Sequence, residues 1–141
     1  MSVTQIKDAC LTAARLFESG DPGGALTALK SVADLTKALP HPHHARLMWL
    51  VAQSWCASST ERPPLEAGAE AEAAALAASD PEHAITGWFQ LTRLAVESGS
   101  PALAKRRAAS LLATAQASLG ELHPNVYEWQ RRLASLMDSS S

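Results

Sequence analysis

The chain has 141 residues, a size that suits one domain, and hydrophobic residues make up 47% of it, enough for a substantial core. A formal net charge of −2 gives no electrostatic case for nucleic acid or an anionic membrane as the partner. No apolar run approaches the roughly 18 residues of a membrane span. The two cysteines, Cys10 and Cys56, are too few and too irregularly placed for a disulfide framework, so we expect a cytoplasmic protein with reduced thiols.

The residue mix favours helices, because alanine and leucine are common and no stretch alternates apolar and polar residues as a half-buried strand does. Glycine at positions 20 and 99 suits the left-handed turn that ends a helix. Proline after Asp or Ser suits a helix start with a capping side chain, as at Asp21–Pro22, Asp80–Pro81 and Ser100–Pro101. We therefore predict seven helices, at about 3–19, 22–38, 42–58, 64–78, 81–98, 101–118 and 124–137.

Three sequence echoes indicate an internal repeat. Glu-Ser-Gly-x-Pro begins at Glu18 and again at Glu97, Pro-x-His-Ala-x-x-x-Trp begins at Pro42 and Pro81, and His-Pro recurs at 41 and 123. The offsets are 79 (97 − 18), 39 (81 − 42) and 82 (123 − 41) residues, so each is close to one or two units of about 40 residues. A unit of that length is typical of a helical-hairpin repeat.

These residues resemble the tetratricopeptide repeat (TPR) family. The third unit carries the pattern best, and its matching positions are Trp88, Leu91, Ala95, Gly99, Ala104 and Leu111. The first unit has Leu16, Gly20, Ala25, Leu29 and Val32 in the matching places, and the second keeps Trp49 and Ala52. The stretch "LGELHPNVYEWQRRLASL" resembles the kinesin-light-chain type of TPR and the helical C-terminal region of SET–MYND proteins.

The resemblance implies an all-α, right-handed solenoid of about three helical hairpins plus a C-terminal capping helix. We expect a single domain over residues 1–141, with units at about 3–38, 42–78 and 81–118 and a capping helix at 124–137. It also implies a non-enzymatic adaptor or scaffold that binds a peptide or helix of another protein in a concave groove, without a cofactor.

In TPR-like hairpins the first helix of each pair lines the groove. Matching the repeat positions places these residues there: Lys7, Phe17, Leu47, Leu50, Thr86, Phe89, Arg93 and Val96. Of these, Phe89 and Arg93 are one helical turn apart and are our expected centre of the binding face. The only asparagine, Asn125, lies outside this predicted groove, which does not favour the two-carboxylate clamp of chaperone-binding TPR proteins.

The "HPHH" cluster, with His41, His43 and His44, is the strongest candidate for a metal site. On a helix, adjacent histidines point about 100° apart, and no acidic or cysteine partner lies near in sequence, so we interpret the cluster as a polar helix start and predict no metal site. The two cysteines fall on apolar helix stripes and are interpreted as core residues.

The run Lys105–Arg107 is interpreted as a solvated face, with an acidic partner as the alternative. There is no phosphate loop, paired-carboxylate motif or nucleophile elbow. Two alternatives to the adaptor stay open: a small helical metal protein or Cys/His enzyme, and a module that dimerises through an end of the solenoid.

Overall fold

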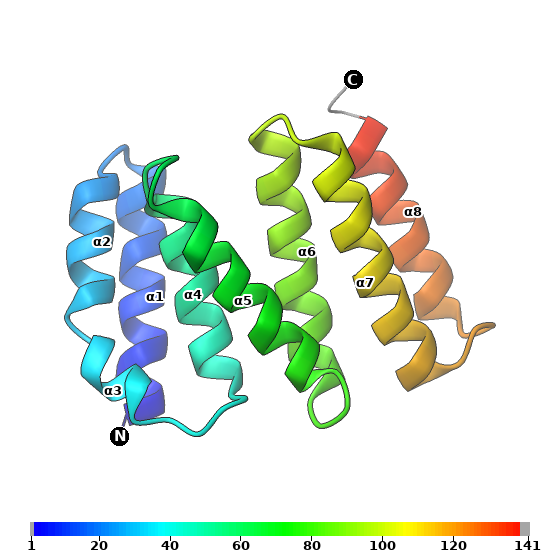
Figure 1. Ribbon diagram of the computed structural model, residues 1–141, viewed down its shortest axis with the longest axis horizontal. Coiled ribbons are helices and arrows are strands. Elements are labelled where there is room, and N and C mark those ends of the chain that lie inside the picture. Colours follow the sequence, from blue (N-terminus) through cyan, green and yellow to red (C-terminus); the bar gives the residue numbers. More distant parts are fainter. Residues whose placement is uncertain (1, 139–141) are drawn as a thin grey trace. The chain divides into compact units, whose positions relative to one another are not determined.

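The structure is a computed structural model that describes residues 2–138, and helices are the only regular secondary structure within that range, which confirms the all-α prediction. The eight helices are α1 (Ser2–Glu18), α2 (Pro22–Lys30), α3 (Ala33–Lys37), α4 (His44–Cys56), α5 (Arg62–Leu76), α6 (Pro81–Glu97), α7 (Pro101–Leu119) and α8 (Pro124–Asp138) (Figure 1). The chain divides into two compact units, unit 1 (Met1–Glu72) and unit 2 (Ala73–Ser141).

The two Glu-Ser-Gly-x-Pro stretches form the same turn, one in each unit. Gly20 has φ 90° and Gly99 has φ 74°, as predicted from the sequence. After α1 the N–H of Asp21 donates to the carbonyl of Leu16 (2.8 Å), and after α6 the N–H of Ser100 donates to that of Ala95 (2.9 Å). This six-to-one bond around a left-handed glycine is the Schellman motif, which pairs a carbonyl that the helix end would leave unpaired.

The helix starts agree with the proline signals, but the caps differ. The Asp21 carboxylate accepts a hydrogen bond from the Gly24 N–H (2.9 Å), and Asp80 accepts one from the His83 N–H (3.5 Å). Ser100 occupies the cap position of α7 without a side-chain cap bond, contrary to our expectation. The repeated turn is therefore closed by its backbone, and the capping side chain differs between copies.

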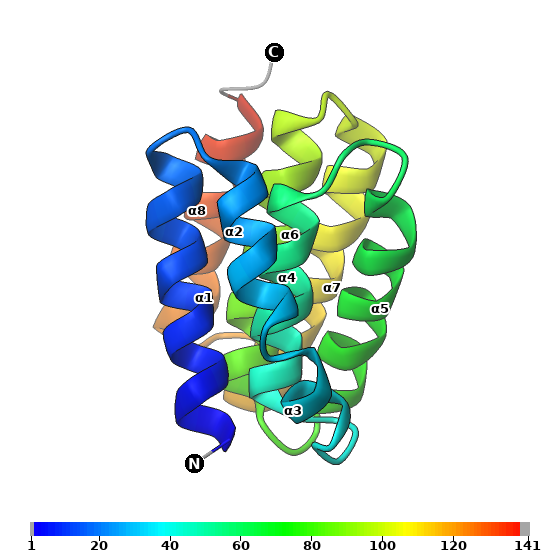
Figure 2. The same ribbon diagram turned by 90° about the vertical axis from the view of Figure 1, so that its left-hand side faces the viewer.

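Unit 1 is built on α1, α2 and α4, which pack against one another as Figures 1 and 2 show. Its core contains Ile6, Ala9, Cys10, Ala13, Ala25, Leu29, Val32, Ala45 and Cys56. Six of these nine residues are alanine or cysteine. Small side chains of this kind let helix axes approach closely.

The helix predicted at 22–38 is broken into α2 and α3. The indole Nε1–H of Trp49, on α4, donates to the carbonyl of Leu29 (2.8 Å), which an unbroken helix would use for Ala33. The N–H of Val32, three residues after Leu29, also donates to this carbonyl (3.3 Å). The Leu29 carbonyl therefore accepts a donor from another helix in place of the Ala33 N–H, and the chain becomes helical again at Ala33, after Ser31 and Val32.

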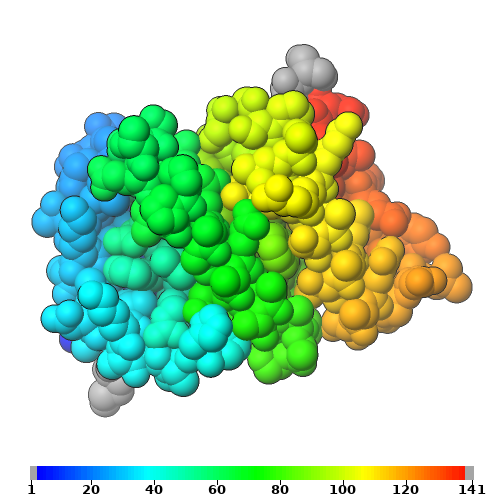
Figure 3. Space-filling model, viewed as in Figure 1, coloured from blue at the N-terminus to red at the C-terminus, as the bar shows by residue number. Residues whose placement is uncertain are grey.

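Within unit 1, side chains at two places connect α5 to α4 and the residues around it. Near the start of α5, the Arg62 side chain donates to the carbonyls of Ser54 (3.0 Å) and Ala57 (3.2 Å). Further along, the buried Glu72 carboxylate accepts the backbone N–H of His43 (3.0 Å). Figure 3 shows the segment before α4 (cyan) lying against α5 (green).

Unit 2 is a hairpin of α6 and α7 with α8 packed against α7. Its buried apolar side chains include Trp88, Leu91, Leu111, Val126 and Leu133. Arg107 is also buried, at 2% exposure, and its guanidinium donates to the carbonyl of Leu91 (2.8 Å). This corrects the solvated-face interpretation of Lys105–Arg107, which holds only for the exposed Lys105 and Arg106.

None of the helices in residues 2–138 combines the length and apolar character needed to cross a membrane.

Candidate functional site

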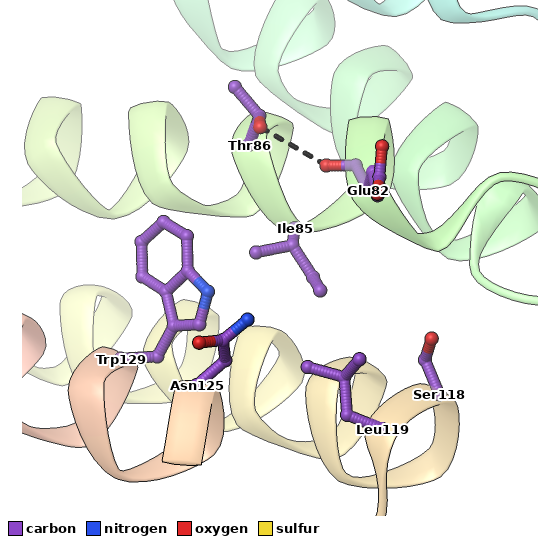
Figure 4. Close-up of a pocket in the computed structure, with 7 residues that line it drawn as sticks. All are labelled: Glu82, Ile85, Thr86, Ser118, Leu119, Asn125 and Trp129. Carbon is purple, nitrogen blue, oxygen red and sulfur yellow. Dashed lines mark hydrogen bonds between the residues drawn. The ribbon is translucent and has the colours of Figure 1, made fainter. Parts of the chain in front are cut away.

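A surface pocket of about 330 Å³ lies in unit 2, between α6, α8 and the end of α7. Figure 4 shows side chains from all three helices around it, with Ile85, Leu119 and Trp129 as its apolar walls. Its lining residues are Glu82, Ile85, Thr86, Ser118, Leu119, Asn125 and Trp129. A volume near 330 Å³ is at the lower end of the range for ligand pockets.

The sequence explains why these residues meet. On α6, Glu82, Thr86 and Phe89 follow a spacing of four and three, which places them on one helix face. After α7, Gly120 has φ 97° and turns the chain, and α8 then begins with Pro124. The His123 ring Nδ1 accepts the Asn125 N–H (3.0 Å), which caps α8 and fixes Asn125 at the pocket.

Next to the pocket lies an aromatic–arginine cluster formed by Phe89, Trp129 and Arg132. The ring centroids of Phe89 and Trp129 are 5.3 Å apart at an interplanar angle of 57°. The Arg132 guanidinium carbon lies 4.8 Å from the Phe89 centroid and 4.4 Å from that of Trp129. Cation–π contact of this kind stabilises the guanidinium against the aromatic faces while its edge stays open to solvent.

The neighbouring arginine on α8 has a different role. Arg131 is hydrogen-bonded to Glu128 through Nε (3.1 Å), and this bond lowers the pKa of the Glu128 carboxyl. Arg93, on α6, donates to the side-chain oxygen of Gln90 (3.3 Å) and is half-buried. Arg132 is therefore the cation that contacts the aromatic pair, whereas Arg93 lies one helical turn after Phe89 on α6.

The predicted groove residues of unit 2 meet this site in part. Thr86 is exposed and lines the pocket, and Phe89 belongs to the aromatic–arginine cluster. Val96 is half-buried further along α6. Asn125, which we expected outside the groove, lines the pocket beside Thr86.

The predicted groove residues of unit 1 are on α1 and α4. Phe17 is 39% exposed and makes an edge contact with Trp55 (centroids 6.4 Å apart), and Lys7 is half-buried. Leu50 is half-buried, and its side chain lies next to Gly68 of α5. Leu47 is only 2% exposed, so it belongs to the core and we remove it from the candidate binding surface.

The histidine cluster has an acidic partner that its sequence neighbourhood does not reveal. The His41 ring Nδ1 bonds one oxygen of Glu72, on α5, while the His43 N–H donates to the other (3.0 Å). Arg46 lies 3.7 Å from the same carboxylate and also donates to the carbonyls of Pro40 (2.8 Å) and Thr36 (2.9 Å).

These contacts hold the segment between α3 and α4 in place. The His43 ring Nδ1 accepts the Ala45 N–H (3.0 Å), so His43 caps α4, as the interpretation of a polar helix start implies. In residues 2–138, no three His, Cys, Asp or Glu side chains are arranged to hold a metal ion.

Both cysteines are buried free thiols in unit 1. Burial raises the pKa of Cys10 from 9.0 to about 11 and raises the pKa of Cys56 as well. At neutral pH such thiols are protonated, and the thiol form is a weak nucleophile. Their environment favours the core role over a Cys/His nucleophile.

Comparison of the chain with protein-family models, with curated proteins and with solved structures gave no match.

Proposed function

We propose that this protein is a non-enzymatic interaction module whose hairpins stack as in a TPR array and which binds a peptide or helix of another protein. The binding face is the pocket in unit 2 together with the adjoining aromatic–arginine cluster. The proposal rests on the TPR-like repeat positions, which select the first helix of each hairpin as the binding element.

One observation carries the proposal. Thr86 and Phe89, which the repeat pattern assigns to the groove, lie respectively in the wall of the pocket and against Trp129 beside it. Tryptophan and arginine are the side chains that most often dominate binding energy at protein interfaces, with surrounding residues excluding water. A partially exposed cluster of Phe, Trp and Arg beside a pocket has that composition.

The charged side chains near the pocket indicate which groups a partner should carry. Glu82 is near the start of the helix, and Arg93 lies eleven residues later on the same face, about 16 Å along the axis. Arg132 adds a second cation beside Phe89. A matching partner therefore presents an apolar side chain to the pocket and a carboxylate to the arginines.

The experiment blocks the pocket without touching the core. Thr86 is exposed, so Thr86→Trp fills the pocket with an indole, and Thr12→Trp places the same side chain on the exposed face of α1 as the control. Proteins captured from a lysate by the wild type and by Thr12→Trp, but not by Thr86→Trp, are the candidates.

One candidate is then purified and titrated by calorimetry. We expect Thr86→Trp to weaken binding by about tenfold or more and Thr12→Trp to bind like the wild type, because an occupied pocket excludes the partner's anchor side chain. Equal affinity of Thr86→Trp and wild type for every captured protein would show that the pocket is not the binding face.

A further inference from the structure

A second pocket, of about 360 Å³, lies within unit 1 and has a different composition. It is bounded by α2, the end of α4, and the start of α5. Figure 3 shows a hollow between α2 (blue) and α5 (green) in which α4 (teal) is visible. Its apolar walls are Leu26, Ala57, Pro64 and Leu65.

The informative residue of this pocket is Gln53. Its exposure is only 7%, and its side chain lines the pocket. Within residues 2–138, no hydrogen bond to its side-chain amide is formed, although that amide carries two N–H donors and an acceptor oxygen. Because Gln53 is so little exposed and lines the pocket, a group that enters the pocket is the partner available to its amide.

The side-chain amide of glutamine matches one chemical group particularly well. A donor and an acceptor held side by side in one plane pair with the N–H and C=O of a peptide backbone, which offers the same two groups. The apolar walls next to Gln53 suit an aliphatic side chain carried by that same peptide unit.

The rim of the pocket selects against a strongly charged ligand. Lys30 and Glu61 both line the pocket and are exposed, and their formal charges cancel. The Glu61 carboxylate accepts the Ser58 hydroxyl (3.2 Å). A neutral segment from the interior of a peptide chain fits this balance better than a chain end with a free carboxylate.

We propose that the unit 1 pocket binds one aliphatic residue of a peptide segment, with the Gln53 side-chain amide hydrogen-bonding to that segment's backbone. This site shares no residue with the proposed binding face of unit 2, and it does not depend on that proposal.

The test uses the full 15N-labelled chain and a minimal probe, N-acetyl-leucine N-methylamide, which carries a leucine side chain between two amides. We expect saturable NMR shifts at the backbone amides of Leu26, Gln53 and Leu65, with a dissociation constant in the millimolar range that is usual for so small a ligand. Gln53→Met keeps the shape of the side chain and removes its hydrogen bonds, and we expect it to weaken the probe about fivefold or more.

Two controls make the result specific. Gln116→Met makes the same substitution on α7, in unit 2, and should leave the affinity unchanged. A second probe, 3-methylbutan-1-ol, has the branched apolar group without an amide, and Gln53→Met should not weaken it. Because the Gln53 amide has no partner in the described part of the chain to leave unpaired, Gln53→Met should also keep the melting temperature. Leu65→Ser is a second variant, which removes an apolar wall of the pocket and should weaken the binding of both probes.

Three results would overturn the proposal. They are the absence of saturable shifts at the pocket residues, equal binding of the leucine amide to wild type and Gln53→Met, and unchanged binding to a folded Leu65→Ser. If N-acetyl-leucine, with its free carboxylate, binds tenfold more tightly than the neutral amide, the commitment to a chain interior is wrong.

Discussion

The two units use charged side chains in contrasting ways. In unit 1, Glu72 is buried and Arg46 is half-buried, and both are engaged by the segment that precedes α4. In unit 2, the exposed Arg132 contacts the aromatic pair beside a surface pocket. The difference teaches that the same residue types are held by backbone and carboxylate groups in one unit and stand against partly exposed aromatic rings in the other, so the contacts of each charge, rather than its residue type, indicate its role.

The contrast predicts that removing a unit 1 charge lowers stability most. Glu72→Ala leaves the His43 N–H and the Arg46 guanidinium without their buried acceptor. We expect a loss of about 2–3 kcal/mol in the free energy of unfolding, since hydrogen bonds to a charged group contribute strongly and the His43 N–H is left without an acceptor. Urea unfolding followed by circular dichroism measures it.

Glu61→Ala is the matched control, because Glu61 is an exposed glutamate in the same unit. It should change stability by less than about 0.5 kcal/mol. If both variants lose the same amount, the Glu72 network does not hold the segment before α4.

The two buried thiols predict a second difference between the units, because both cysteines are in unit 1. The unfolded Cys10 thiol deprotonates near its pKa of 9.0, whereas the folded thiol keeps its proton until about pH 11. The unfolded state therefore binds fewer protons between these values, and stability falls as pH rises through them. By pH 11 we expect unit 1 to lose on the order of 2 kcal/mol.

Hydrogen exchange followed by NMR separates the two units. The double variant Cys10→Ala with Cys56→Ala should lack this alkaline loss in unit 1, and unit 2 should show none from this source. An alkaline loss of the same size in the double variant would assign the effect to other groups.

The repeated turn predicts an equal, smaller effect in the two units. Gly20 and Gly99 share a positive φ and the same backbone bonds, and an added Cβ meets no atom within 4 Å at either. The cost of Gly20→Val or Gly99→Val is then the backbone strain alone, about 1–2 kcal/mol. Ser98→Ala, at a position with ordinary helical φ of −83°, should cost far less.

Thermal unfolding of the three variants provides the comparison. Unequal losses for the two glycine variants would show that one turn is supported by contacts other than its own bonds.

Local chemistry made much of the fold predictable. Proline after Asp80 and the glycine at 99 mark helix boundaries because their backbone preferences act on immediate neighbours. The break between α2 and α3 could not be predicted in this way, since it depends on Trp49, twenty residues beyond the carbonyl that it binds.

The candidate site was predictable only along a single helix. The repeat pattern placed Thr86 and Phe89 on one face of α6, because both follow the helical period. That Asn125 and Trp129 complete the site depends on how α8 packs in unit 2, which the local sequence does not express. Glu72 was missed for the same reason: it joins His41 from 31 residues away.

The measurement that tests the binding face most directly is the pair of effects of Arg93→Glu on stability and affinity. For the partner identified by the pocket block, we expect about tenfold weaker binding or more, because the inverted charge faces the partner's carboxylate. The melting temperature should stay nearly unchanged, because Arg93 is only half-buried and partly screened charges of this kind contribute little to folding. Lys105→Glu, an exposed reversal on α7, should leave both quantities unchanged. Wild-type affinity in Arg93→Glu, or unfolding of that variant, would contradict the assignment.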